Sequence, residues 1–224
     1  MRLVEFTESP RTFHGRDIPS DSEPELWWNH VTEPALVLGS TQRDESIVAL
    51  DVCAAEGVDV VRRRSGGGAV LLVPGEVVWF DVVIPNGRVP GLGGDVHAPM
   101  LWLGRHLAGI VGPLLSGEVR VSGPAMITTA WSNLICFDGF GPGEVLLDGR
   151  KLVGISQRRT RAAARLQCCW YRSYDPTHLP RLLAPTARPP LDELSSVATA
   201  DIDPRPVLEA LARTLTPEFV PPTR

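Results

Sequence analysis

A hairpin signal in the second half of the chain limits the possible folds more than any other feature. Two β-rich segments, residues 144–147 and 151–158, flank the pair Asp148-Gly149. Asp-Gly between two such segments favours a two-residue turn, which joins antiparallel strands. Further β-rich segments outnumber the helices that could connect parallel strands. We therefore predict an α+β fold with a mixed, largely antiparallel sheet flanked by helices, and not a doubly wound parallel sheet.

The remaining apolar patterns place further elements around this hairpin. Strands are expected over residues 2–6, 35–38, 58–61, 76–84, 118–121 and 163–174. Helices are expected over residues 24–30, 46–56, 97–111 and 206–214, the first of them capped by Asp21 or Ser22. Residues 7–20 are expected to form a loop. The length favours one domain over residues 1–224, with a helical C-terminal tail from about residue 176 and no large accessory domain.

Charge and cysteine usage limit the partners and the compartment. The net charge is −4 and the pI is near 5.7, which argues against general binding to nucleic acids or anionic membranes. The start has no signal-peptide pattern, and no apolar stretch reaches about 18 residues, so no membrane span is expected. The four cysteines lack metal-ligand spacing. They fit a reducing, cytoplasmic setting, and we expect no metal site.

Lys151, at the start of the second hairpin strand, is the only lysine in the chain, and all other basic residues are arginine. An arginine side chain ends in a broad planar fork, whereas a lysine side chain ends in a compact ammonium that can enter a narrow space. We therefore interpret Lys151 as a charge placed beside a reacting group. The alternative is a surface lysine that persists by chance in an arginine-rich composition.

A glycine-rich segment, residues 62–70, follows the strand expected at 58–61. Three consecutive arginines lead into Ser65 and three consecutive glycines. Glycines let a ligand lie against bare backbone, their N–H groups can hold an anion, and arginines offer forked donors to phosphate or carboxylate. The alternative is a tight turn with solvated arginines. The segment matches neither a Walker loop, which needs Gly-Lys-Ser/Thr, nor the GxGxxG fingerprint of dinucleotide-binding folds.

Three segments in order along the chain resemble the motifs of one enzyme family. They are Pro34-Ala35-Leu36-Val37-Leu38-Gly39-Ser40-Thr41-Gln42, Arg63-Arg64-Ser65-Gly66-Gly67-Gly68-Ala69-Val70 and Asp148-Gly149-Arg150-Lys151-Leu152-Val153-Gly154-Ile155-Ser156-Gln157-Arg158. Together they resemble the lipoate–protein ligase family, which is grouped with the biotin–protein ligases and the lipoyl/octanoyl transferases. The resemblance covers roughly residues 30–175. It implies the fold of the biotin/lipoate protein ligase catalytic domain, which is similar to class II synthetases.

The resemblance also implies roles for the matching positions. In the family the glycine loop wraps the acyl chain and its activated head, and the motif lysine lies on the carbonyl and phosphate oxygens of an acyl-adenylate. Lys151 matches that catalytic lysine, and an ammonium there would stabilise charge on both oxygens. The positions expected to bind the acyl-adenylate are Arg63, Arg64, Ser65, Gly66, Gly67, Gly68, Ala69, Gly154 and Ser156.

The family reaches its product by two routes, and the sequence leaves both open. Ligases use ATP, with Mg²⁺, to form an acyl-AMP, whereas transferases carry the acyl group as a thioester on a cysteine. Cys136, followed by Phe137 and placed 15 residues before Lys151, resembles the cysteine of the octanoyltransferases. A thiolate beside Lys151 would be stabilised and could act as the nucleophile, although a free cysteine can also serve packing alone. Three further cysteines are interpreted as packing residues: Cys53, Cys168 and Cys169.

The chain departs from the ligase pattern at three places. The Gly-Asn-Asp-Leu type of segment before the lysine is matched only in part, by Ser132-Asn133-Leu134. Leu71-Leu72 replace the His-Asp that commonly follows the glycine loop, and Gln167-Cys168 replace a downstream His-Gly. Our leading prediction is a ligase that attaches lipoate or octanoate, without a permanently bound cofactor, to a lysine of a lipoyl-carrier protein. The expected acceptors are the glycine cleavage H protein or the E2 subunit of a 2-oxoacid dehydrogenase. The alternatives are the Cys136 thioester route and a non-catalytic binder of acyl ligands, with biotin transfer ranked below them.

Overall fold

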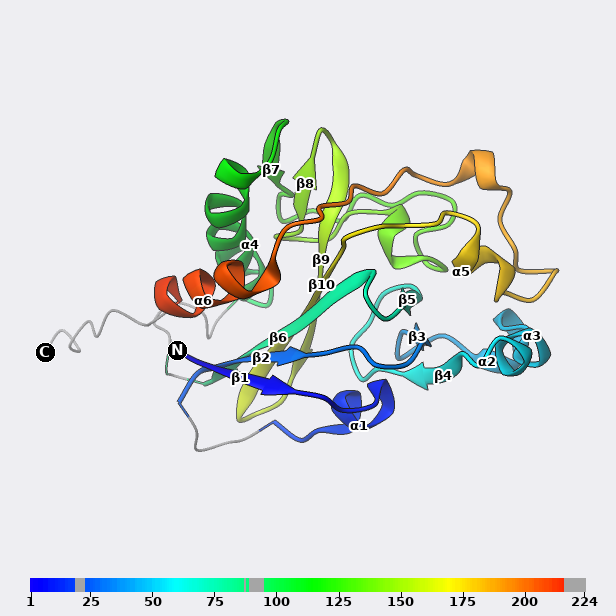
Figure 1. Cartoon of the computed structure of the whole chain (residues 1–224), viewed down its shortest axis with the longest axis horizontal. Helices are drawn as coiled ribbons and strands as arrows, with labels where there is room; N and C mark the ends of the chain where they lie inside the picture. The colour runs from blue at the N-terminus through cyan, green and yellow to red at the C-terminus, as the bar shows by residue number, and fades with distance from the viewer. Residues whose placement is uncertain (19–22, 87, 89–94, 216–224) are drawn as a thin grey trace, which may run out of the picture.

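A seven-stranded sheet in the order β1-β2-β6-β10-β9-β8-β7 dominates the structure, a computed structural model that describes residues 1–18, 23–86, 88 and 95–215 (Figure 1). A second sheet has the order β4-β3-β5. The strands are β1 (Arg2–Phe6), β2 (Glu25–Asn29), β3 (Ala35–Leu38), β4 (Asp59–Arg62), β5 (Val70–Leu72), β6 (Val77–Pro85), β7 (Val119–Val121), β8 (Val145–Leu147), β9 (Arg150–Arg159) and β10 (Ala163–Tyr171). Only the pairs β1–β2 and β3–β4 are parallel among these strands. The predicted α+β class with a largely antiparallel sheet is confirmed.

Helices α4 and α6 cover one face of the large sheet, and the small sheet and the short helix α1 lie on the other (Figure 1). The helices are α1 (Pro10–Gly15), α2 (Asp44–Ile47), α3 (Leu50–Ala55), α4 (Ala98–Val111), α5 (His178–Arg181) and α6 (Pro204–Thr214), with 3₁₀ turns η1 (Gly112–Leu114), η2 (Cys136–Asp138) and η3 (Leu191–Glu193). Leu103 of α4 and Leu208 of α6 join the core on the helical face, whereas Trp27 and Trp79 join the core that faces the small sheet. None of the described helices is long and apolar enough to cross a membrane.

The predicted hairpin is confirmed and lies inside the large sheet. Strands β8 and β9 pair antiparallel, and the turn residues Asp148 and Gly149 have φ values of 50° and 75°. Two consecutive positive φ values define the turn that suits the twist of a hairpin, and glycine and aspartate tolerate them better than most residues. Because β9 also pairs with β10, the hairpin carries Lys151 into the interior of the sheet.

The helix predicted over residues 24–30 is wrong, because this segment is strand β2. Its expected caps, Asp21 and Ser22, lie outside the described residues. Leu26 and Trp28 belong to the core beneath the helices, and Trp27 belongs to the core on the opposite face. A strand buried on both faces has no polar side, so its apolar run could not be told from a buried helix by periodicity alone.

Two further segments differ from prediction. The loop expected over residues 7–20 contains helix α1, whose N-cap Ser9 accepts a hydrogen bond from the Thr12 N–H at 3.2 Å. The single helix expected over residues 46–56 is divided into α2 and α3. Val48 forms a β-bridge with Leu183 at the break. A contact with a segment more than a hundred residues away interrupts the helix, so the local pattern could not reveal it.

The chain beyond β10 returns along the sheet to α6 (Figure 1). The predicted helical tail contains α5, η3 and α6, joined by extended segments. In one of these, the Ala198 N–H donates to the Lys151 carbonyl at 2.9 Å, and the Ala200 N–H donates to the Tyr171 carbonyl at 2.9 Å. The C-terminal segment therefore helps to fix the backbone of β9 at Lys151.

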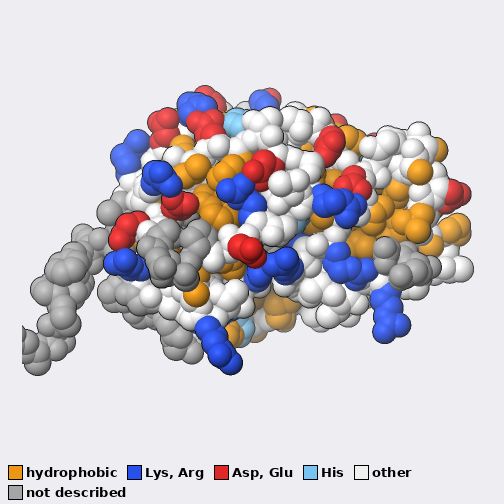
Figure 2. Space-filling view, turned by 90° about the horizontal axis from the view of Figure 1, so that it is seen from below, with side chains coloured by type: hydrophobic (Ala, Val, Ile, Leu, Met, Phe, Trp, Pro, Cys, Tyr) orange, Lys and Arg blue, Asp and Glu red, His pale blue; other side chains and the backbone are white. Residues whose placement is uncertain are grey.

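Asp81 of β6 and Arg165 of β10 form an ion pair in the interior. The Arg165 Nε atom lies 2.5 Å from Asp81 Oδ2, and both side chains are 0% exposed. The guanidinium also donates to the carbonyl oxygens of Phe13 and Arg16, at 2.8 and 3.2 Å. The pair therefore joins the central strands to α1. On the surface drawn in Figure 2, by contrast, basic and acidic side chains are interspersed and face water.

We expect Asp81→Ala to lower the free energy of unfolding by about 3–5 kcal/mol, because it leaves the Arg165 guanidinium buried without a counter-ion. Urea denaturation followed by tryptophan fluorescence measures the change. The control is Asp59→Ala, which removes an exposed partner of Arg11 and should cost less than about 1 kcal/mol. Equal, small effects of the two substitutions would contradict this assignment.

Candidate active site

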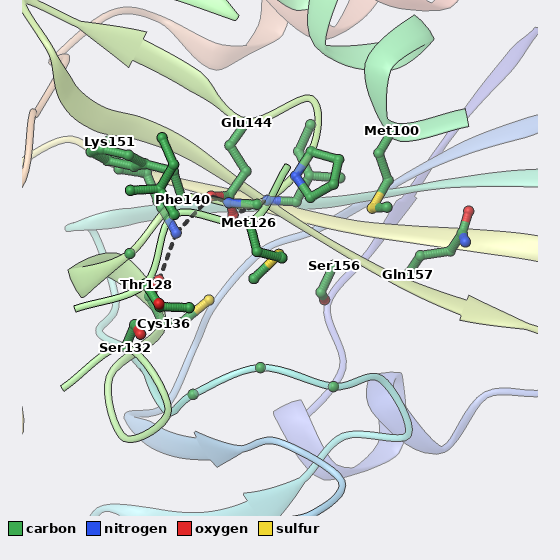
Figure 3. Close-up of a pocket in the computed structure, with 18 of the residues that line it drawn as sticks. Met100, Met126, Thr128, Ser132, Cys136, Phe140, Glu144, Lys151, Ser156 and Gln157 are labelled. Carbon is green, nitrogen blue, oxygen red and sulfur yellow. Dashed lines mark hydrogen bonds and ion pairs between the residues drawn. The ribbon is translucent and has the colours of Figure 1, made fainter. Parts of the chain in front are cut away.

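A cavity of about 420 Å³ lies between β9, the glycine loop and the segment that precedes β8. Figure 3 shows side chains from these parts facing one another across it. The predicted site residues on its wall are Gly66, Gly67, Gly68, Cys136, Lys151 and Ser156. Its apolar lining includes Met100, Ile127, Phe140 and Ile155. Segments more than eighty residues apart in the sequence therefore meet at one place.

Lys151 is held at the inner wall of this cavity by two short contacts. Its Nζ atom donates to the carbonyl oxygen of Cys136 at 2.6 Å and lies 2.7 Å from Glu144 Oε2. The Lys151 side chain is 2% exposed, and its ammonium lies 5.3 Å from the centre of the Phe137 ring. An ammonium has three donors, and the contacts with Cys136 and Glu144 use two of them.

Glu144 is a site residue that sequence reasoning missed. Its Oε2 also accepts a hydrogen bond from the Gly141 N–H at 2.7 Å, and its Oε1 accepts one from the Ile155 N–H at 3.1 Å. The carboxylate thus binds the loop before β8, the backbone of β9 and the ammonium of Lys151. The sequence offered one indication of its role: Glu144 is an acidic residue at the start of an apolar strand, in the hairpin that contains the only lysine of the chain.

Cys136 is half-buried and lies where the glycine loop meets the segment before β8. Its N–H donates to the Ala69 carbonyl at 2.9 Å, and its Sγ atom lies 3.9 Å from Arg63 Nη2. Burial raises the pKa of Cys168 well above its usual range, and burial likewise raises the pKa of Cys169. Those two thiols are therefore poor nucleophiles, whereas Cys136 lines the cavity.

Arg63 holds the glycine loop from inside. It is 5% exposed, and its Nη2 atom donates to the carbonyl oxygens of Gly66 and Gly68 at 2.8 and 3.0 Å. Gly67 has a φ of 99°, which disfavours residues with side chains. A Cβ atom on Gly68 would lie 2.7 Å from the Cys136 nitrogen. The glycines therefore permit both the turn and the close approach of the loop to Cys136.

The wall of the main cavity does not include five predicted binding positions: Arg63, Arg64, Ser65, Ala69 and Gly154. Arg64 is exposed and lies 3.5 Å from Asp17. Ala69 is buried, and its N–H donates to the Leu134 carbonyl at 2.7 Å. Gly154 lies against the ring of Phe137. Their contacts in this structure are with other parts of the protein, and their roles in ligand binding stay predictions.

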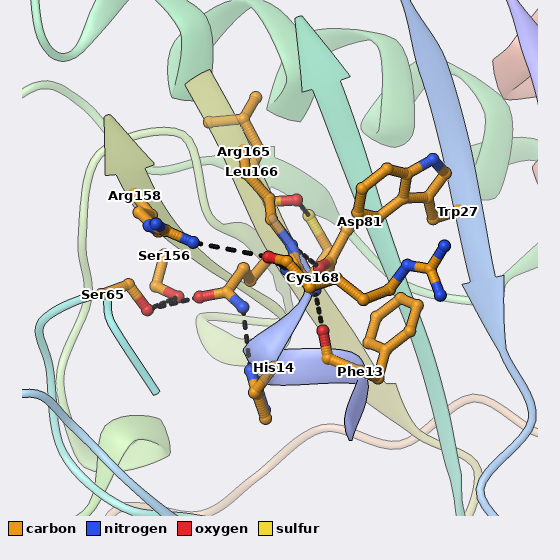
Figure 4. A network of polar contacts seen from close by, with 12 residues as sticks. Phe13, His14, Trp27, Ser65, Asp81, Ser156, Arg158, Arg165, Leu166 and Cys168 are labelled. Atoms are coloured by element: carbon orange, nitrogen blue, oxygen red, sulfur yellow. Dashed lines mark hydrogen bonds and ion pairs between the residues drawn. The ribbon is translucent and has the colours of Figure 1, made fainter. Parts of the chain in front are cut away.

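A chain of polar side chains continues behind the glycine loop (Figure 4). The hydroxyl of Ser65 lies 3.0 Å from that of Ser156 and donates to Gln167 Oε1 at 2.6 Å. Gln167 Nε2 in turn lies 2.9 Å from His14 Nδ1. Ser156 lies on the wall of the main cavity and of a smaller one of about 30 Å³ that His14 and Gln167 also line. Ser65 therefore orients the side chains of Ser156 and Gln167. The sequence analysis did not identify His14, because its segment was expected to form a loop and instead contains α1.

We expect Gly68→Ala to separate the glycine loop from Cys136, because the added Cβ would meet backbone atoms of Ile135 and Cys136. Overpacking of this kind costs about 1–3 kcal/mol in unfolding free energy. The rate at which iodoacetamide alkylates Cys136 should therefore differ between Gly68→Ala and the unsubstituted protein. Gly66→Ala is the matched control, since its Cβ would meet no atom within 4 Å. Equal behaviour of the two variants would refute this account of the loop.

His14 makes the stability of the fold sensitive to acid. Burial lowers the pKa of His14 well below its usual range, with Arg165 and Arg63 adding to the effect. In the unfolded chain the His14 imidazole binds a proton near pH 6.5, whereas in the folded chain it stays neutral at that pH. The free energy of unfolding should therefore fall as the pH drops below about 6.5. Urea denaturation at several pH values should show a shallower decline in His14→Gln, by up to about 1.4 kcal/mol per pH unit. Parallel curves for the two proteins would exclude this role.

The described residues contain no group of three or more His, Cys, Asp or Glu side chains that could hold a metal ion.

The geometry can be compared with that of known proteins. A family model described as the lipoyl protein ligase A/B catalytic domain matches residues 14–216. Octanoyltransferase LipM of Kyrpidia tusciae is 31% identical over 147 residues, which cover 57% of this chain and 47% of the relative. Octanoyltransferase LipM of Carboxydothermus hydrogenoformans is 30% identical over 148 residues, covering 63% and 51%. This chain spans about half the length of the curated relatives it matches.

Solved structures show the same fold at low sequence identity. The crystal structure of a lipoate-protein ligase A bound with ATP superposes with a TM-score of 0.70 and 20% identity, covering 95% of this chain and 82% of that one. A bipartite lipoate protein ligase from Thermoplasma acidophilum superposes with a TM-score of 0.65 and 18% identity, with the same coverage. The family model covers most of the chain and the fold agrees with it, so this chain belongs to the lipoyl protein ligase A/B catalytic domain family.

Proposed function

We propose that this chain transfers an octanoyl or lipoyl group to the side-chain amine of a lysine on a lipoyl-carrier protein, through a thioester on Cys136. The observation that carries the proposal is the position of the Cys136 thiol on the wall of a cavity that also contains the Lys151 ammonium. Arg63 lies 3.9 Å from the sulfur. The thiol is therefore placed where an acyl group in the cavity could reach it, and cysteine is a common nucleophile in acyl transfer.

The reaction would proceed in two balanced steps. In the first, the Cys136 thiolate attacks the carbonyl carbon of an acyl thioester donor; the new C–S bond forms as the donor's C–S bond breaks, and the donor thiolate leaves. In the second, the acceptor amine attacks the Cys136 thioester; a C–N bond forms, the Cys136 sulfur leaves, and the amine releases a proton. Both steps develop negative charge on the acyl oxygen, which the free N–H of Lys151 would stabilise.

The cavity suits an acyl chain of moderate length. Its lining combines apolar side chains such as Met100, Phe140 and Ile155 with the bare backbone of the glycine loop. A volume of about 420 Å³ lies within the range of small-molecule sites, roughly 300–1,000 Å³. The similarity to octanoyltransferase LipM and the structural likeness to lipoate-protein ligase A support the same class of acyl substrate. The four unpaired cysteines fit a cytoplasmic location.

The second candidate is an ATP-dependent ligase that forms an acyl-AMP. The open space above Gly66 and the anion-binding potential of consecutive glycines favour it. Lipoate or octanoate and ATP with Mg²⁺ would be its substrates, and Lys151 would contact the phosphate. One structural neighbour was solved as part of a lipoylation system with its E2 lipoyl domain, which supports an acceptor of the lipoyl-domain type for either route.

We expect the purified chain to transfer the octanoyl group of a carrier-protein thioester to an apo lipoyl domain without ATP. Cys136→Ser should abolish this transfer. Mass spectrometry of the acceptor measures the product. A parallel reaction with free lipoate or octanoate, ATP and Mg²⁺ tests the ligase. Modification that needs ATP and persists in Cys136→Ser would overturn the thioester route, and the absence of both reactions would favour a non-catalytic binder.

Lys151→Ala should lower the transfer rate by about 100- to 1000-fold, as loss of an oxyanion donor does in comparable sites. Lys151→Arg should restore little of it, because the broader guanidinium does not fit the buried position between Glu144 and the Cys136 carbonyl. Initial rates at saturating acceptor measure both effects. A fully active Lys151→Arg variant would show that the shape of the cation is unimportant.

A further inference from the structure

Glu144 is a buried carboxylate whose hydrogen bonds all belong to the framework of the site. The side chain is 3% exposed, and it lines the same cavity as Cys136. Both of its oxygens are occupied: Oε1 accepts from the Ile155 N–H, and Oε2 accepts from the Gly141 N–H and from Lys151. Three of the roughly four acceptor sites of the carboxylate are therefore used by the framework of the site, so we look for its role in the groups it holds.

The charge of Glu144 matters most to Lys151. The other two contacts of the ammonium are with the neutral carbonyl of Cys136 and the ring of Phe137. Burial without an opposite charge favours the neutral amine over the ammonium. A neutral amine would bring little stabilisation to a developing oxyanion. The negative charge beside Lys151 therefore determines whether the lysine can perform its function.

We propose that Glu144 is a positioning residue for acyl transfer, which keeps Lys151 protonated and directs its remaining N–H toward the acyl carbonyl in the cavity. This inference rests on the proposed function, because Glu144 acts on the reaction through Lys151. A purely structural role would require only that Glu144 join its loop to β9, and it would leave the protonation of Lys151 unchanged.

The single lysine of the chain allows a direct test that needs no activity. Protein labelled with ¹³C-lysine gives one side-chain Cε signal, that of Lys151, whose chemical shift reports protonation of the amine. We expect the signal of Glu144→Gln to change at a lower pH than that of the wild-type protein, because the buried ammonium has lost its counter-ion. Glu144→Asp, which keeps the charge, should follow the wild-type curve. A Glu144→Gln curve that coincides with the wild-type curve would overturn the proposal.

Transfer rates give the second readout. The ratio of the Glu144→Gln rate to the wild-type rate should fall by about tenfold or more as the pH rises through the range in which the lysine signal of this variant changes, because the ammonium is lost. For Glu144→Asp the ratio should stay constant with pH. Glu118→Gln is the matched control, since the Glu118 side chain is 61% exposed on the neighbouring part of the sheet and pairs with Arg120. Its ratio should be close to one throughout.

Unfolding measurements on each variant separate an effect on folding from an effect on acyl transfer. Thermal unfolding of each variant verifies that the compared proteins are folded. If Glu144→Gln does not fold, Glu144→Asp alone must follow the wild-type lysine curve and keep a constant rate ratio. A lysine curve of Glu144→Asp shifted to lower pH, or a Glu144→Gln rate ratio independent of pH, overturns the proposal. If no transfer is found for the wild-type protein, the proposed function fails, while the lysine signal still decides whether Glu144 controls the charge of Lys151.

Discussion

The buried ion pair between Lys151 and Glu144 holds together the segments that form the cavity. Burying two charges costs hydration energy, and such a pair persists only where additional hydrogen bonds satisfy both partners. Here backbone N–H groups of Gly141 and Ile155 bind the carboxylate, and the carbonyl of Cys136 binds the ammonium. The segment that contains Cys136, the loop before β8 and strand β9 are thereby fixed relative to one another. The shape of the cavity follows from this arrangement.

The parts of the fold that carry strong local signals could be predicted from the sequence. Asp148-Gly149 placed the hairpin correctly, and the apolar periodicity of residues 97–111 placed α4 correctly. The segment around Trp27 was assigned wrongly, because a strand covered on both faces has no alternating polar side. The division between α2 and α3 depends on the bridge from Val48 to Leu183. Contacts at such sequence distances leave no trace in a local pattern.

The site was predicted only in part, because the contacts of some of its residues are with partners far away in the sequence. The glycine loop, Cys136 and Lys151 have unusual compositions or resemble known motifs, and the structure brings them to one cavity. Arg63 was expected to bind a ligand, yet in this structure it holds the loop carbonyls. Glu144 and His14 were overlooked, since their importance lies in the partners that folding gives them. A buried acid or histidine can be recognised only when its neighbours are known.

The account depends most on Cys136 as the residue that carries the acyl group. Its position beside Lys151 and Arg63 makes it the nucleophile in the proposed route. The most direct test incubates the full chain with an octanoylated carrier, without ATP and without an acceptor, and locates any adduct by peptide mass spectrometry. The account predicts one octanoyl group on the Cys136 peptide, released by hydroxylamine. An adduct on another residue, or acylation that appears only when ATP is added, would contradict it.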